Sequence, residues 1–138
     1  MSSYNKFNKT VRYLIDAGFN FTSDTFKICL TNTLPSAANA VFTDITEIAA
    51  GNGYTAGGSA TTITESDSGG VATVKGSNVV FTASGGSIGP LRYAVLYDST
   101  NAAKPLIAWW DYGSSVTLNA TETLTVAFDG TNGIFQIS

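Results

Sequence analysis

Carboxylates are the side chains of this sequence best suited to chemistry. Asp98 and Asp111 each lie near the end of an apolar, aromatic-rich segment, and a glycosidase needs two carboxylates that flank one glycosidic bond. If the two segments pair as strands, the carboxylates could approach each other. No spacing in the sequence sets their separation, and acids are common at strand ends, so a structural role is the simpler interpretation.

Other reactive side chains are scarce. The 138 residues include no histidine and one cysteine, so the commonest proton carrier and metal ligand is missing. Cys29 lies in an apolar segment, where a free thiol usually packs as a small hydrophobic group. Calcium ligands could be sought among four acids, but no Asp-x-Asp-x-Asp-Gly loop joins them. These four are Asp44, Glu47, Asp98 and Asp129. We therefore expect no enzymatic activity, no cofactor and no metal.

Three glycine-rich stretches, 50–58, 68–70 and 84–90, suggest a nucleotide-binding loop at first sight, but 68–70 is only a turn-like sequence. The stretches 50–58 and 84–90 both lack the Lys-Ser/Thr pair of a P-loop, and no helical pattern follows either one to present its N-terminus to a phosphate. The glycines instead suit turns that need positive φ, or a close backbone approach at a contact between subunits.

A group of aromatic residues could form a platform on which a sugar ring stacks. On segments as apolar as these, the same rings more simply build a core. The group comprises Tyr93, Tyr97, Trp109, Trp110 and Tyr112.

One segment has the period of an amphipathic helix. Its apolar residues Tyr4, Phe7, Val11, Leu14 and Ile15 recur at helical spacing, and basic residues lie off this stripe. The pattern predicts one short N-terminal amphipathic helix over about residues 4–17, ending at a glycine. The helix could pack on its own domain or reach a neighbouring subunit.

From residue 26 onward the pattern is that of β-strands, separated by turns rich in glycine and asparagine. The segments 91–97 and 105–112 are apolar on both faces, so we expect them to be central strands covered on both sides. The other expected strands are 26–30, 59–64, 71–75, 78–82, 116–118, 124–128 and 134–137, with a weaker apolar segment at 41–48 and a turn at 129–133. We predict one all-β domain over 1–138, a β-sandwich or jelly-roll-like fold.

Charge is sparse and unevenly distributed. Charged residues make up 12% of the chain, so much of the surface must be small and hydroxyl side chains that suit lasting contacts between subunits. The first 27 residues hold four basic and two acidic side chains, and the rest hold three basic and eight acidic ones. The net charge of −3 argues against nucleic acid as a partner, and no apolar run is long enough for a membrane span.

Several stretches resemble a group of small virion proteins of tailed phages, similar to capsid decoration (cement) proteins. The stretches that carry the resemblance are 4–9, 25–33, 44–48, 51–58, 92–98 and 109–113. The resemblance implies a β-sandwich that binds the major capsid protein on the outside of the shell in many copies, commonly as a homotrimer. It implies no catalytic residue. We expect synthesis in the cytoplasm of the bacterial host and a final location on the capsid exterior. A tail, neck or fibre-associated protein and a carbohydrate-binding module are the alternatives.

Two segments are predicted to supply contacts to the capsid or to other subunits. The basic N-terminal segment could meet an acidic shell, and the glycine-rich loop carries one large side chain that could anchor it. The predicted contact residues are Tyr4, Lys6, Lys9, Arg12, Gly53, Tyr54, Gly57 and Gly58. In the competing interpretation the helix caps its own sandwich and Tyr54 fills a gap beneath the loop.

Overall fold

The computed structural model describes residues 4–138, and within them the fold is all-β with a minor helical part. The strands are β1 (Tyr4–Lys6), β2 (Phe26–Thr31), β3 (Ser59–Thr61), β4 (Ile63–Ser68), β5 (Val71–Gly76), β6 (Val79–Thr82), β7 (Ile88–Asp98), β8 (Leu106–Leu118), β9 (Thr123–Val126) and β10 (Phe135–Ile137). The helices are α1 (Asn8–Ile15) and the short 3-10 helix η1 (Phe42–Asp44). The prediction of an all-β fold with one short α-helix is confirmed.

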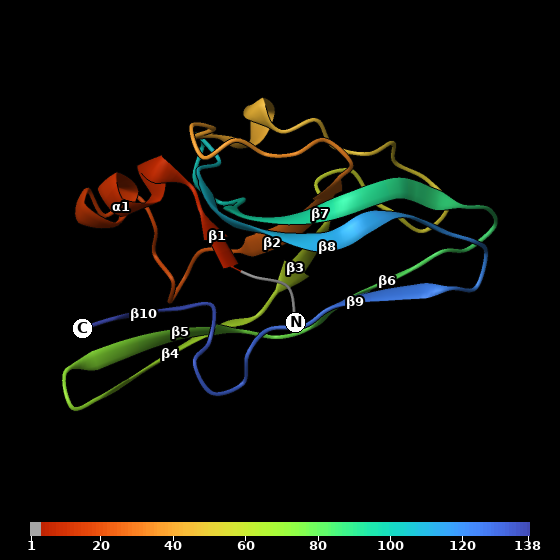
Figure 1. Ribbon diagram of the computed structural model, residues 1–138. Coiled ribbons are helices and arrows are strands. Elements are labelled where there is room, and N and C mark those ends of the chain that lie inside the picture. The colour runs from red at the N-terminus through yellow and green to blue at the C-terminus, as the bar shows by residue number, and fades with distance from the viewer. Residues whose placement is uncertain (1–3) are drawn as a thin grey trace.

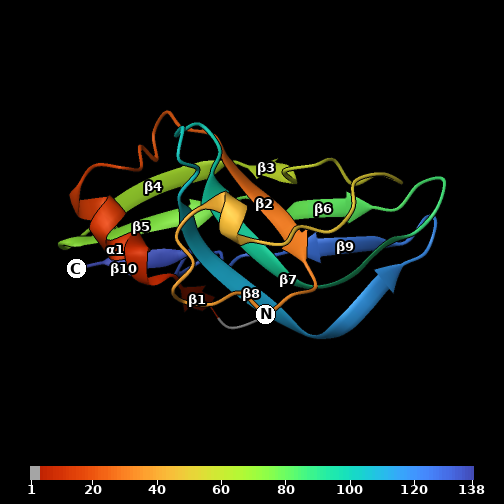
Figure 2. The same ribbon diagram turned by 90° about the horizontal axis from the view of Figure 1, so that it is seen from above.

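The strands form two layers. The large sheet has the order β1-β8-β7-β2-β3, and all of its neighbours are antiparallel. Two smaller sheets, β10-β5-β4 and β6-β9, lie together beneath it (Figure 1). Seen from above, the sheet β10-β5-β4 lies toward the end of the molecule that carries α1, and the sheet β6-β9 lies toward the opposite end (Figure 2). The long strands β7 and β8 therefore form the middle of the molecule, as expected for its most apolar segments.

The main core lies between the two layers, and the alternation along β2 shows how the sequence builds it. Phe26, Ile28 and Leu30 are fully buried and belong to the core between the layers, together with Phe81 of β6. Residues of one strand alternate between its two faces, so Cys29 lies on the opposite face of the sheet.

A second core covers the other face of the large sheet. Cys29 packs there with Val95, Leu106 and the fully buried Phe7. The segment around η1, the weak apolar stretch of the sequence, closes this side, and its Phe42 ring stacks on Tyr97 at 4.6 Å between ring centroids. Figure 1 shows η1 above the large sheet, so the central strands are covered on both sides as predicted.

The extent of the predicted helix over 4–17 is corrected. Residues 4–6 form β1, which pairs with Trp110–Ala108 of β8, and the helix begins only at Asn8. Phe7 is extended (φ −79°, ψ 145°) and buried, so its burial against the sheet ends the strand and sets the helix start. A three-residue strand is too short for its period to be distinguished from one helical turn.

The predicted strand 116–118 is also corrected, because β8 continues through it without a break. Gly113 lies inside β8 at φ +105°, a conformation open to glycine, and so the glycine bends the strand instead of ending it. No helix within residues 4–138 has the length and hydropathy needed to cross a lipid bilayer.

Candidate functional site

Helix α1 packs on its own domain through one face and leaves the other uncovered. Thr10 is buried and its hydroxyl bonds the carbonyl oxygens of Leu106 and Ile107 at 3.1 and 2.9 Å. Val11 and Ile15 lie on the outer face, where 43% and 77% of their surface is exposed. Both belong to the predicted apolar stripe, whose Leu14 packs on the main core, so the domain covers only part of that stripe.

The basic residues of the N-terminal segment are exposed. Lys9 and Arg12 are exposed on the helix, and Lys6 is exposed on β1. Arg12 forms an ion pair with Asp16 at 2.6 Å between Nε and Oδ2. Lys6 and Lys9 form no ion pair with a residue in the described part of the chain. We call Lys9, Val11, Arg12 and Ile15 the outer face of α1.

Tyr4 does not belong to this surface. It lies on β1 opposite Trp110, and the two rings meet edge to face at 6.1 Å between centroids. Its burial raises the pKa of the Tyr4 phenol above the ordinary value. The Tyr4 side chain is 38% exposed and is presented by β1, not by the helix.

The prediction that Tyr54 anchors a partner is wrong, because its side chain is 2% exposed. The Tyr54 hydroxyl accepts the Leu30 N–H and donates to Glu47 Oε2, both at 3.0 Å. Glu47 Oε2 also accepts the Gly57 N–H at 2.8 Å, and the Tyr97 hydroxyl donates to the Gly57 carbonyl at 2.6 Å. The loop is thus bonded to its own domain, as in the competing interpretation. The sequence suggested Glu47 only as a possible calcium ligand, because its role depends on contacts between distant segments.

The glycines of the loop are required by its close approach to the strands. Gly53 and Gly58 have φ of +100° and +83°, and a Cβ at either position would overlap a backbone carbonyl, that of Thr82 or of Ile28. Gly57 also has a positive φ, and a Cβ there would meet the Tyr97 hydroxyl at 3.2 Å. These glycines let the loop seat against the sheets, which accounts for them without a partner.

The candidate reactive groups are held in structural roles. Cys29 is fully buried, and burial, with the nearby Glu47 charge, raises the pKa of its thiol well above the ordinary value. Burial likewise raises the pKa of the Tyr54 and Tyr97 phenols. These groups stay protonated near neutral pH, so none of the three is an activated nucleophile. No cluster of three or more His, Cys, Asp or Glu side chains suited to a metal occurs within residues 4–138.

The two carboxylates considered for glycosidase chemistry are kept apart. Asp111 of β8 pairs in register with Tyr93 of β7, and Tyr93 lies five residues before Asp98. At 3.4 Å per residue the backbone positions of the two acids are about 17 Å apart along the strands. This is well beyond the roughly 5–9.5 Å between carboxyl groups that glycoside hydrolysis uses. Asp98 is instead buried beside Asp24, and Asp111 is paired with Arg92.

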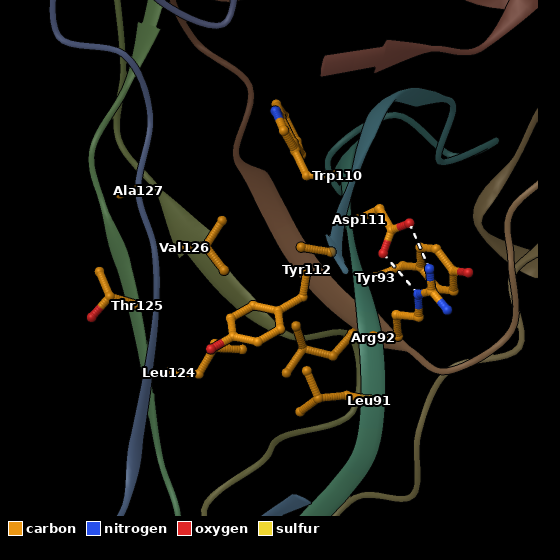
Figure 3. Close-up of a pocket in the computed structure, with 12 residues that line it drawn as sticks. Leu91, Arg92, Tyr93, Trp110, Asp111, Tyr112, Leu124, Thr125, Val126 and Ala127 are labelled. Carbon is orange, nitrogen blue, oxygen red and sulfur yellow. Dashed lines mark hydrogen bonds and ion pairs between the residues drawn. The ribbon is translucent and has the colours of Figure 1, made fainter. Parts of the chain in front are cut away.

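A pocket of about 680 Å³ lies where β7 and β8 face β9. Its apolar wall includes Leu91, Trp110, Leu124 and Val126, and Tyr112 extends from β8 toward β9 (Figure 3). Trp110 and Phe128 meet edge to face at 5.3 Å between centroids, which fixes the indole ring.

The polar wall of this pocket is an ion pair. Arg92 Nε and Nη2 donate to the two Asp111 oxygens at 2.8 and 3.1 Å, and Asp111 Oδ1 also accepts the Gly113 N–H at 2.8 Å. The bond to Arg92 and the bond from Gly113 lower the pKa of Asp111. Figure 3 shows the pair on the other side of the β7–β8 hairpin from Tyr112, so the pocket bends around the hairpin. The sequence did not predict this pairing, because it depends on the register of β7 and β8.

The chain matches no protein-family model, and comparisons with curated proteins and with solved structures also found no match.

Proposed function

We propose that this chain is a non-enzymatic structural protein of a tailed-phage virion, which binds the outer surface of the capsid as a decoration protein. The observation that carries the proposal is the two-sided packing of α1. One side is fixed to the domain through Thr10, and the other presents the exposed Val11 and Ile15 together with the exposed basic residues Lys9 and Arg12. Exposed apolar side chains on a rigid element, bordered by charge, are typical of a protein contact.

The partner that suits this surface is an acidic patch on the major capsid protein. Lys6 and Lys9 are exposed and free of ion pairs with described residues, so their charges are available to opposite charges on a shell. Long-range attraction would bring the protein to the shell, and burial of Ile15 would hold it there. Transfer of one such side chain from water contributes about 1–2 kcal/mol, close to a tenfold change in affinity.

Weak attachments of this size become strong when several act together. A homotrimer would present three copies of the outer face of α1 to the shell, and the linked contacts would multiply their affinities. The fixed positions of the reactive groups support a structural role, because the thiol and the buried phenols serve packing and hydrogen bonds.

The test uses purified capsids that lack the protein. The variants Ile15→Ser and Lys9→Glu change the outer face of α1 without removing a buried group. Deleting the N-terminal segment would be a poorer test, because it would also remove the buried Phe7. Val80→Ser is the matched control, because Val80 is 55% exposed on β6. We expect each α1 variant to need at least a tenfold higher concentration for half occupancy, and the control to bind normally.

Two outcomes would contradict the proposal. Unchanged occupancy in the α1 variants would show that the helix is not the contact surface. Labelling of the protein on intact phage particles with gold-conjugated antibodies should decorate heads. Labelling confined to tails would favour a tail, neck or fibre-associated protein instead.

A further inference from the structure

Strand β9 is an open edge of the lower layer. Its sheet has two strands within residues 4–138, so β9 pairs with β6 on one side and with no described strand on the other. The unpaired N–H and C=O groups of an edge strand are a template for a further strand. We propose that β9 pairs antiparallel with β9 of a second copy of this chain, across a two-fold axis at Thr125.

The ladder between β6 and β9 fixes which backbone groups face outward. The Ala83 N–H bonds the Glu122 carbonyl, one residue beyond the register pair that Thr123 makes with β6. In an antiparallel ladder this bond makes the Thr123 pair one without direct hydrogen bonds, and bonded and non-bonded pairs alternate. The N–H and C=O groups of Thr123 and Thr125 therefore point away from β6, toward the open side.

Other exposed edges carry features that discourage strand addition, and β9 does not. The edge strand β4 bears the charged Glu65 and Asp67, and β8 bends at Gly113 beyond its pairing with β1. The edge strands β1, β3 and β10 have three residues each. Residues 123–127 contain no charge and no proline, and the register of β6 with β9 runs without a bulge. Strand β9 is thus the edge most open to pairing.

The sequence of β9 favours a second copy as the partner. Residues 123–127 read Thr-Leu-Thr-Val-Ala, which is nearly symmetric about Thr125. An antiparallel copy centred there places Leu124 opposite Val126 and one Thr125 opposite the other, so apolar side chains meet apolar ones and hydroxyls meet hydroxyls. Because this stretch holds no charge, two identical edges meet without repulsion, and a charged peptide would gain no attraction.

The space beside β9 can receive the side chains of the added strand. Leu124 and Val126 face the pocket beneath β8, and side chains opposite each other in a ladder lie on the same face, so the same residues of the second copy would face it too. Tyr112 lies between β8 and β9 with 56% of its surface exposed (Figure 3). The added strand therefore covers apolar surface that a single chain leaves open.

This contact is separate from the surfaces of the proposed function. A two-fold contact joins two copies, so it differs from a homotrimer contact and is compatible with one. It shares no residue with the outer face of α1 and does not rest on attachment to a capsid.

The first experiment measures association of the full chain by sedimentation from about 10 μM to about 1 mM. We expect a dimer with a dissociation constant of about 0.1–1 mM, as for a small contact. Thr125 is exposed, so Thr125→Glu and Thr125→Lys keep the fold but place two like charges at the axis, and each should weaken dimerisation at least tenfold. An equimolar mixture of the two variants should regain it, because opposite charges then face each other. Thr64→Glu, at an exposed threonine of the edge strand β4, should dimerise as the original protein does.

The second experiment tests the register with Thr125→Cys. The proposed pairing brings the two Cα atoms within the roughly 4.4–6.8 Å that a disulfide spans. Diamide, which takes up the two electrons and two protons of the thiols, should give a disulfide-linked dimer of this variant and none of Thr64→Cys, since the chain's own Cys29 is fully buried.

Three results would overturn the proposal. They are a chain that stays monomeric at about 1 mM, an oligomer that both charges at Thr125 leave unchanged, and equal cross-linking of the two cysteine variants. Neither experiment uses α1 or a capsid, so this proposal and the proposed function can fail independently.

Discussion

Replacing Asp98 by asparagine changes one carboxylate oxygen to an amide at the buried end of β7. Asp98 Oδ1 accepts the N–H groups of Thr100 and Asn101 at 2.9 and 3.2 Å, and the asparagine carbonyl can keep both bonds. Asp98 Oδ2 is buried and has no hydrogen bond that meets normal geometry within residues 4–138. The Asp24 carboxylate lies beside it, so an amide N–H of asparagine would face an acceptor where two negative charges now meet.

The magnitude follows from the pKa of Asp98. Burial, and second the neighbouring Asp24, raise this pKa from 3.8 to about 6. One pKa unit corresponds to about 1.4 kcal/mol, so ionisation of Asp98 destabilises the native state by about 3 kcal/mol at most. Part of the shift comes from the charge of the half-buried Asp24, which solvent and salt screen, so we expect about 1–2 kcal/mol.

The direction of the Asp98 pKa shift determines how stability depends on pH. The folded protein binds the Asp98 proton more tightly than the unfolded chain, so the penalty is absent below pH 3.8 and complete above about pH 6. Stability should therefore fall as pH rises from 4.5 to 7. With no histidine in the chain, few other groups titrate in that window. Backbone hydrogen bonds lower the pKa of Asp44 and Asp129, which places their titration below it.

The assay is urea unfolding of the protein and of Asp98→Asn at pH 4.5 and pH 7. The variant should be more stable by about 1–2 kcal/mol at pH 7 and should lose most of the pH dependence. Asp24→Asn should act in the same direction, because it removes the neighbouring charge. Asp98→Ala should destabilise at both pH values, because two backbone N–H groups lose their acceptor. An Asp98→Asn variant that is less stable than the original at pH 7, or an original protein whose stability is flat across the window, would refute the reasoning.

Three further perturbations test the loop and the second core. Gly58→Ala should cost at least about 3 kcal/mol or prevent folding, because its Cβ would overlap a β2 carbonyl, whereas Gly69→Ala, at φ +57° with open space around it, should cost about 1 kcal/mol in the same urea titration. Tyr54→Phe should lower the free energy of unfolding by about 1–3 kcal/mol, because the buried Leu30 N–H of β2 loses its acceptor. A Tyr54→Phe variant as stable as the original protein would contradict the bonding described for the loop. Cys29 should react with a thiol reagent only at the rate of unfolding, and rapid labelling of the native protein would show that the second core opens.

The sequence alone determined the parts of this protein that depend on local periodicity. The alternation of Phe26, Ile28 and Leu30 with their neighbours predicted a strand with one apolar face, and these three residues line the core between the layers, since neighbouring residues of a strand point in opposite directions. The continuous apolar character of β7 and β8 predicted central strands covered on both sides. These patterns extend over enough residues for the period to be read without knowledge of any partner strand.

The tertiary structure decided everything that depends on which distant segments meet. Local period did not separate β1 from α1, because the burial of Phe7 against the sheet places the boundary. Tyr54 became a core residue only once β2 lay beside the loop, and Arg92 met Asp111 only through the register of β7 and β8. Such contacts follow from the packing of strands far apart in the chain, which gives each residue neighbours that its own stretch of sequence does not specify.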